Sequence, residues 1–154
     1  IMRQAAEQRS LALIADVAPC LPALPADRRT CKQMLLNLIA NAIKFTDPGG
    51  VVRVSAREVQ GNIELSVADN GIGIAKKDLP KLGNPFVQAD NGRGRGGDGT
   101  GLGLSVVSGL AELHGGRLVL ESTLGQGTTA TIILPCRPGD SRAGPAKGAE
   151  VSAA

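Results

Sequence analysis

The sequence of 154 residues has almost no aromatic side chains: tryptophan and tyrosine are absent, and only Phe45 and Phe86 carry rings. Proteins that bind single-stranded nucleic acid stack bases on exposed rings, so this composition argues against such a platform. The formal net charge of +3 is also too small and too dispersed for a nucleic-acid footprint. We therefore expect no nucleic-acid partner.

The chain also lacks long apolar runs and paired metal ligands. No apolar run reaches the roughly 18 residues that cross a bilayer, and no signal peptide opens the chain. The three cysteines, Cys20, Cys31 and Cys136, form no CxxC pair, and His114 is the only histidine. This pattern predicts reduced thiols rather than a disulfide framework or a zinc site. We expect a cytoplasmic chain with no direct membrane contact.

Glycine is abundant, with 21 residues, about twice the usual share of roughly 7%. Hydrophobic residues make up 42%, enough for one core. Apolar periodicity, prolines and glycines predict strands over 11–17, 52–57, 63–67, 117–123 and 128–134 and helices over 27–46, 75–79 and from 101. This order predicts a two-layer α/β sandwich, with about three helices on one face of a mixed five-stranded sheet.

The same pass along the chain predicts three segments. Residues 1–10 end a linker or a preceding helix, which indicates a fragment of a longer protein, and residues 11–136 form the folded domain. Residues 137–154 are rich in Pro, Gly, Ala, Ser and charge, which is typical of a disordered tail or linker. In the helix from 101, we expect one buried face made of Val106, Val107, Leu110 and Leu113.

A polar stripe runs along the predicted helix over 27–46. Gln33, Asn37, Asn41 and Lys44 fall within roughly 80° of arc. A solvated outer face is the common explanation of such a stripe, but two asparagines are poor helix formers there. An amide oxygen can ligate a hard cation and a nearby lysine suits a polyphosphate. The stripe therefore indicates the lining of a site.

A carboxylate stands where the strand over 63–67 ends, in the run Asp69-Asn70-Gly71-Ile72-Gly73-Ile74. An Asx turn would explain this run without a ligand. The alternative is a fixed acceptor beside backbone that glycine leaves open to a flat ligand, such as adenine with its amino group.

A second glycine-rich run, Gly97-Asp98-Gly99-Thr100-Gly101-Leu102-Gly103-Leu104, leads directly into a helix. Backbone amides at a helix N-terminus, freed of side chains by glycine, form an anion site for phosphate. A flexible linker does not normally alternate leucine with glycine in this way. The Walker pattern GxxxxGK[ST] is absent, and no strand precedes the glycines in the manner of a dinucleotide fold.

Taken in order, these motifs resemble those of sensor histidine kinases. NLIANAIKFT resembles their N box, DNGIGI the first glycine box, NPFVQAD the F box, GTGLGLSVV the second glycine box, and GQGTTATIILP the closing strand. The resemblance covers about residues 5–135. It implies the Bergerat ATP-binding fold of the superfamily that includes gyrase, the Hsp90 chaperones and MutL.

The resemblance implies ATP and Mg²⁺ as cofactors and assigns roles within the site. Asn41 would coordinate magnesium with Asn37 beside it, Lys44 would contact the phosphates, and Asn37 and Lys44 would form the catalytic pair. Asp69 would bind the adenine amino group. The remaining nucleotide-binding residues implied are Gly71, Gly73, Ile74, Phe86, Arg93, Arg95, Gly99, Thr100, Gly101, Leu102, Gly103, Leu104, and Thr128 or Thr129 at the adenine end. Residues of about 81–100 would form an ATP lid.

Three functions follow from these residues, in different classes. The first is a kinase fragment that donates the γ-phosphate of Mg-ATP to a histidine on a dimerisation domain outside this chain, for relay to a response regulator receiver domain. The parent would then be a homodimer and could be anchored in a bacterial inner membrane. The second is a nucleotide-sensing scaffold without phosphotransfer. A gyrase-like ATPase is disfavoured, because those relatives carry Glu where Asn37 stands, and His114 is expected to be structural.

Overall fold

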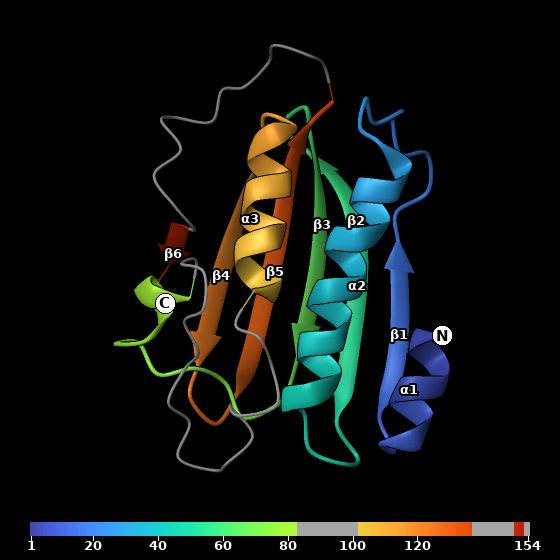
Figure 1. Cartoon of the computed structure of the whole chain (residues 1–154). Coiled ribbons are helices and arrows are strands. Elements are labelled where there is room, and N and C mark those ends of the chain that lie inside the picture. Colours follow the sequence, from blue (N-terminus) through green and yellow to red (C-terminus); the bar gives the residue numbers. More distant parts are fainter. Residues whose placement is uncertain (83–101, 137–149, 153–154) are drawn as a thin grey trace.

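A mixed sheet covered on one face by helices forms the body of the protein (Figure 1). This computed structural model describes residues 1–82, 102–136 and 150–152. The sheet has the strand order β1-β2-β3-β5-β4-β6, in which β1 pairs with β2 and β4 with β6 in parallel, and the other pairs are antiparallel. The predicted two-layer α/β sandwich is confirmed.

Most elements lie close to their predicted bounds. The strands are β1 (Ala12–Val17), β2 (Val51–Val59), β3 (Asn62–Asp69), β4 (Arg117–Thr123), β5 (Gly127–Pro135) and β6 (Glu150–Ser152). The helices are α1 (Met2–Gln8), α2 (Arg28–Phe45), α3 (Gly103–Leu113) and the short 3-10 turn η1 (Leu79–Lys81). At the β2–β3 hairpin, Gln60 and Gly61 both have positive φ, which is the geometry of a tight two-residue turn.

Helix α2 begins and ends where the sequence predicts. The Asp27 carboxylate accepts hydrogen bonds from the backbone N–H and hydroxyl of Thr30, which caps the helix N-terminus. At the other end, Thr46 is extended and its buried hydroxyl donates to the Ala42 carbonyl over 2.6 Å. The chain leaves the helix abruptly at this point and returns into β2.

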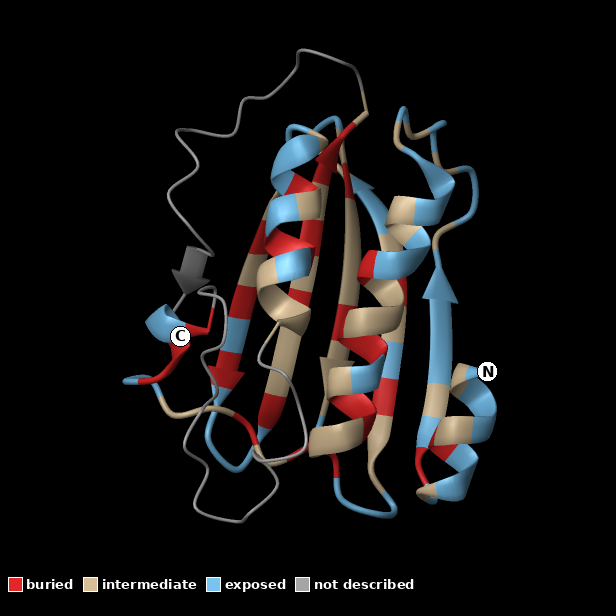
Figure 2. Cartoon of the chain, in the orientation of Figure 1, coloured by how far each residue is buried: buried red, intermediate tan, exposed pale blue. Residues whose placement is uncertain are grey.

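One core lies between the helices and the sheet (Figure 2). Met34, Leu38 and Ala42 of α2 are buried in it, as are Val107 and Ala111 of α3. The sheet contributes inward-facing side chains at every second position, among them Val52, Val67, Leu118, Leu120, Ile132 and Leu134. Ala6 of α1 joins the same core, so the segment predicted as a preceding helix packs on the domain.

Three expectations need correction. The sheet has a sixth strand, because the three residues of β6 pair with the free edge of β4 within the segment predicted as a disordered tail. The helix predicted over 75–79 is a turn followed by η1, since Pro80 lies at the start of a single 3-10 turn. The buried face of α3 is centred on Val107, Ser108 and Ala111.

The difference in α3 is one of rotation. Val106 and Leu113 are exposed, with 82% of Leu113 accessible to solvent. Leu104 and Leu110 are partly buried against the core instead. Ser108 is tolerated on the buried face because its hydroxyl donates to the Glu112 carboxylate over 3.1 Å. The apolar pattern did not predict this buried face of α3, because one of its central residues is a serine.

Candidate functional site

Three segments far apart in the sequence meet at one end of the sheet (Figure 1). They are the C-terminal half of α2, the C-terminal end of β3 with the loop that follows it, and the N-terminal end of α3. These are the segments that carry the polar stripe, the carboxylate and the second glycine run. The fold therefore brings together the features that the sequence singled out separately.

The polar stripe of α2 lies along the edge of its buried face. Asn37, Asn41 and Lys44 are all half-buried, whereas Gln33 is exposed. The Gln33 amide donates to the Asn37 side-chain oxygen over 3.4 Å. The Lys44 ammonium lies 5.1 Å from the centre of the Phe45 ring. A fully solvated face would leave all four side chains exposed, so partial burial of three of them favours the interpretation as a lining.

Helix α3 approaches this stripe at Gly103. A Cβ placed on Gly103 would lie 3.4 Å from the amide nitrogen of Asn41, an ordinary van der Waals contact, so the start of α3 lies next to that amide. Leu102 caps α3, with its carbonyl accepting from the hydroxyl of Ser105 over 2.9 Å, and Leu104 packs against the core. An amide and a helix N-terminus side by side can serve an anion together with its cation.

Six of the predicted site residues lie outside the described residues. They belong to the predicted lid and to the start of the second glycine run: Phe86, Arg93, Arg95, Gly99, Thr100 and Gly101. Their predicted roles in nucleotide binding remain predictions.

Asp69 is held at the end of β3 by two backbone donors. Its Oδ1 accepts from the N–H of Gly71 over 2.9 Å and from the N–H of Thr128 over 3.3 Å. Burial raises the pKa of this carboxyl above its ordinary value of 3.8, although both hydrogen bonds act in the opposite direction. Both bonds engage one oxygen, which leaves Oδ2 as an acceptor for a ligand.

The loop after Asp69 is fastened to the rest of the protein through its glycines. A Cβ on Gly71 would clash with the carbonyl oxygen of Phe45, and one on Gly73 with the backbone of Thr123. Gly73 also has a φ of 65°. The N–H of Ile72 donates to the Phe45 carbonyl over 3.1 Å. Glycine is therefore required at both positions for the loop to pack between α2 and β4. The sequence pattern indicates only the access that these glycines give to a flat ligand.

Ser122 is a site residue that sequence reasoning missed. It is buried near the C-terminal end of β4, on the face of the sheet that the helices cover. Its hydroxyl donates to the Gly127 carbonyl over 2.8 Å and accepts from the N–H of Ile74 over 2.8 Å. It also lies 2.9 Å from the Thr128 hydroxyl. The available signal was a serine in register with Leu118 and Leu120, at a position that strand alternation assigns to the core.

The two threonines proposed for the adenine end lie on opposite faces of the sheet. Thr128 pairs with Asp69 in the β3–β5 register, whereas Thr129 pairs with Ala68. Because successive side chains alternate between faces, Thr128 shares the face of Asp69 and the helices. Thr129 points to the other face, so of the two predicted threonines the register favours Thr128 as the residue at the adenine end.

The donor set for a metal ion is sparse. Among the described residues there is no group of three or more His, Cys, Asp or Glu side chains that could hold one. Magnesium commonly keeps several waters and takes only one or two protein ligands together with nucleotide phosphates. The Asn41 amide beside the start of α3 fits that mode, and a dedicated protein cage does not. In the part of the chain that is described, no helix is long and apolar enough to cross a membrane.

Comparison with known proteins defines the class of this domain. Residues 26–138 match the family of histidine kinase-, DNA gyrase B- and HSP90-like ATPases, and the chain belongs to this family. Several of its sequence relatives are named as histidine kinases. It is 48% identical over 110 residues to the histidine protein kinase DivJ of Caulobacter vibrioides, a match that covers 71% of this chain and 18% of DivJ.

Further relatives and solved structures agree. The chain is 46% identical over 131 residues to a sensor-like histidine kinase of Rhizobium meliloti, covering 84% of this chain and 25% of the relative. It superposes on the mycobacterial sensor histidine kinase MprB with a TM-score of 0.76 and 27% identity, covering 89% of this chain and 91% of that one. Full-length ShkA in complex with AMPPNP gives a TM-score of 0.71 and 34% identity, covering 87% and 29%.

The chain spans only 17% to 25% of the length of three of its curated relatives. It corresponds to the ATPase domain of these proteins. Its fold is that of histidine kinase catalytic domains, including the domain of ThkA, with a TM-score of 0.74.

The raised pKa of Asp69 predicts how stability depends on pH. The folded protein holds this proton more tightly than the unfolded chain, so ionisation of Asp69 lowers the free energy of unfolding as the pH rises through the raised pKa. Asp69→Asn removes this titration. We therefore expect the free energy of unfolding of Asp69→Asn, minus that of the unchanged protein, to increase as the pH is raised from about 3 to about 7. Urea unfolding at each pH measures this difference.

The matched control is Asp16→Asn, the same chemical change at an exposed position of β1. Its stability relative to the unchanged protein should vary less over this range. A difference between Asp69→Asn and the unchanged protein that is constant with pH would contradict the account of Asp69.

Proposed function

We propose that this chain is the catalytic ATP-binding domain of a sensor histidine kinase. It binds Mg-ATP and donates the γ-phosphate to a histidine on a dimerisation domain outside this chain, for relay to a response regulator receiver domain. The observation that carries the proposal is the meeting of a half-buried acceptor, Asp69, with the amide and lysine stripe of α2 and the start of α3.

The adenine end of the site is formed by Asp69 and its neighbours. The free oxygen of Asp69 accepts a hydrogen bond from the adenine amino group, while Gly71 and Thr128 hold the other oxygen in place. Ser122 binds the Thr128 hydroxyl and the N–H of Ile74, so the wall around the base is fixed before the nucleotide arrives. A preformed acceptor reduces the ordering cost of binding.

The phosphate end is formed by α2 and α3. Lys44 contacts the phosphates, and Asn41, with Asn37 one turn earlier, lies beside the N-terminal end of α3, next to which the phosphates would bind. Magnesium would be held by Asn41 and would neutralise phosphate charge when bound. Phosphoryl transfer requires mainly positioning and charge stabilisation, which these side chains and the helix N-terminus provide.

The comparisons support the proposal in two ways. The sequence relatives are named as histidine kinases, and the ShkA structure is a complex with AMPPNP, an ATP analogue. The length of those relatives supports the proposed partners, since this chain spans about a fifth of them and the rest of each relative has room for a phosphoacceptor and further domains.

Nucleotide binding is tested by thermal unfolding with and without Mg-ATP. At about 100 times its dissociation constant, a ligand stabilises the folded state by about 2.7 kcal/mol, which raises the melting temperature of a domain of this size by several degrees. We expect Asp69→Asn to abolish the increase while remaining folded, because its side-chain amide could present a donor to the adenine amino group. An Asp69→Asn variant that binds ATP like the unchanged protein would falsify the assignment.

Asp16→Asn again serves as the control and should retain the full increase. If ATP binds but the γ-phosphate never reaches the phosphoacceptor domain of the full-length protein, the chain acts as a nucleotide-sensing scaffold. Phosphotransfer to that domain would establish the kinase.

Asn41 is tested through the magnesium dependence of ATP binding. Because its amide is the ligand proposed for magnesium, Asn41→Ala should weaken ATP binding in the presence of magnesium and leave binding in EDTA nearly unchanged. Isothermal titration of each variant with ATP under both conditions measures this. The control is Asn62→Ala, at the start of β3 and far from the site. If Asn41→Ala retained the full effect of magnesium, Asn41 would not be its ligand.

A further inference from the structure

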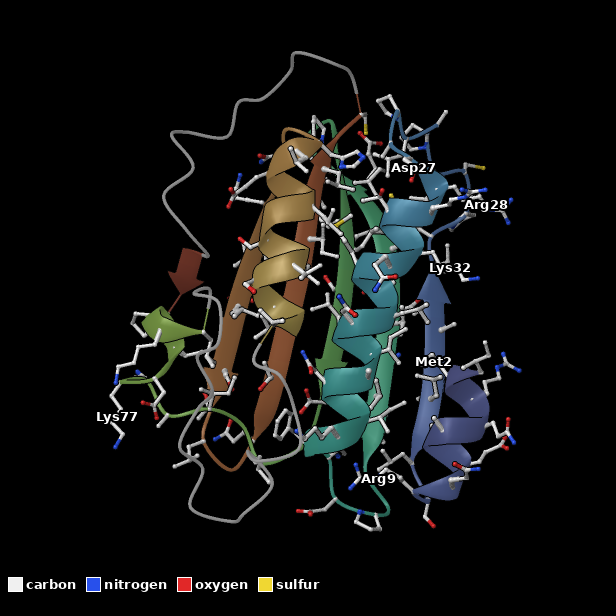
Figure 3. The ribbon with its side chains drawn as sticks, in the orientation of Figure 1. Met2, Arg9, Asp27, Arg28, Lys32 and Lys77 are labelled. Atoms are coloured by element: carbon white, nitrogen blue, oxygen red, sulfur yellow. The ribbon has the colours of Figure 1, made fainter. Side chains whose placement is uncertain are left out.

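The C-terminal end of α2 is held by an arginine that lies outside the polar stripe. The Arg9 guanidinium, through Nη1, donates to the carbonyl of Ile43 over 3.1 Å and to the carbonyl of Lys44 over 3.2 Å. Arg9 follows α1, 34 and 35 residues before these acceptors in the sequence. Figure 3 shows it beside the last turn of α2, at the end of the molecule where the site lies.

These contacts matter because the last four carbonyls of a helix have no partner within it. In α2 the carbonyl of Ala42 accepts from the Thr46 hydroxyl, and that of Phe45 accepts from the N–H of Ile72 in the site loop. Arg9 donates hydrogen bonds to the two carbonyls between these, those of Ile43 and Lys44. A cation at this end also interacts favourably with the helix dipole. The final turn, which carries Lys44, is thus fixed by the site loop and by Arg9 together.

The backbone of Arg9 is itself rigidly placed. Helix α1 ends in a turn in which Ser10 has a φ of 56° and the N–H of Leu11 donates to the carbonyl of Ala6 over 2.9 Å. Ala6 and Leu11 are both buried. The carbonyl of Ser10 accepts from the N–H of Gly49 over 2.8 Å, which ties the same corner to the loop after α2.

We propose that Arg9 is a positioning residue for the phosphates of the nucleotide. It acts through Lys44: by holding the Lys44 carbonyl, it fixes the direction in which that side chain leaves the helix. The position of α1 is thereby coupled to the phosphate end of the site, and a displacement of α1 that withdraws Arg9 weakens ATP binding. This inference rests on the proposed function, in which Lys44 contacts the phosphates.

A double-mutant cycle separates positioning from stability. The variants are Arg9→Met, which keeps the apolar stem and removes the donors, Lys44→Met, and the two combined. We expect Arg9→Met to weaken Mg-ATP binding about three- to tenfold when Lys44 is present. This is the size of effect expected when a charged hydrogen bond is lost and only part of its free energy contributes to nucleotide binding. When Lys44 is replaced, Arg9→Met should change the affinity less than about twofold. Isothermal titration gives the affinities.

Arg3→Met is the matched control, because it removes the same charge from an exposed position of α1, the helix that Arg9 follows. It should leave ATP affinity unchanged. Urea unfolding of each variant reports stability separately. If Arg9→Met lowers stability too far for titration, Arg9→Gln, which keeps one amide donor, takes its place in the cycle.

The outcomes distinguish this inference from the function on which it rests. A loss of affinity from Arg9→Met that is equal in both backgrounds, or absent in both, overturns the positioning role. A loss confined to the background with Lys44 supports it. Failure of the unchanged protein to bind Mg-ATP contradicts the proposed function instead.

Discussion

The rotation of α2 about its own axis is the constraint on which the site depends. Met34, Leu38 and Ala42 bury one side of this helix against the sheet, and their packing allows no other side to face inward. Asn37 and Asn41 lie three residues after Met34 and Leu38, so their side chains lie at the edge of the core, on the side of α2 that the start of α3 approaches. The hydrophobic core therefore determines which polar groups the site contains.

The second requirement is a carboxylate that stays in place although its environment disfavours its charge. Burial raises the pKa of Asp69, and the N–H groups of Gly71 and Thr128 offset part of that cost. Ser122 in turn fixes Thr128 and Ile74. The protein thus maintains an acceptor in a partly dehydrated environment, where a hydrogen bond from a ligand is stronger than in water.

The sequence predicted those parts of the fold that local patterns control. Asp27 starts α2 through its own side chain, and the Gln60-Gly61 turn fixes the register of β2 with β3. It failed where tertiary contacts decide. Ser108 hides on the buried face of α3 with Glu112 as its partner, and the short strand β6 forms only because β4 presents a free edge.

The site shows the same division. Asn37, Asn41, Lys44 and Asp69 could be selected from residue type and spacing. Thr128 could not be distinguished from Thr129 without the register that pairs it with Asp69. Ser122 and Arg9 were missed because their partners lie elsewhere in the fold: Ser122 bonds to Ile74, 48 residues away, and Arg9 to the end of α2. No short motif contains both members of either pair.

Recognition of the adenine amino group by the half-buried carboxylate of Asp69 is tested most directly by comparing ATP with inosine triphosphate in isothermal titration. The two nucleotides differ at the position of that amino group, where inosine carries a carbonyl oxygen that would face the oxygen of Asp69. We expect ATP to bind at least about a hundredfold more tightly, because a site built to accept a hydrogen bond rejects a ligand that lacks the donor. Equal affinity for the two nucleotides would contradict it.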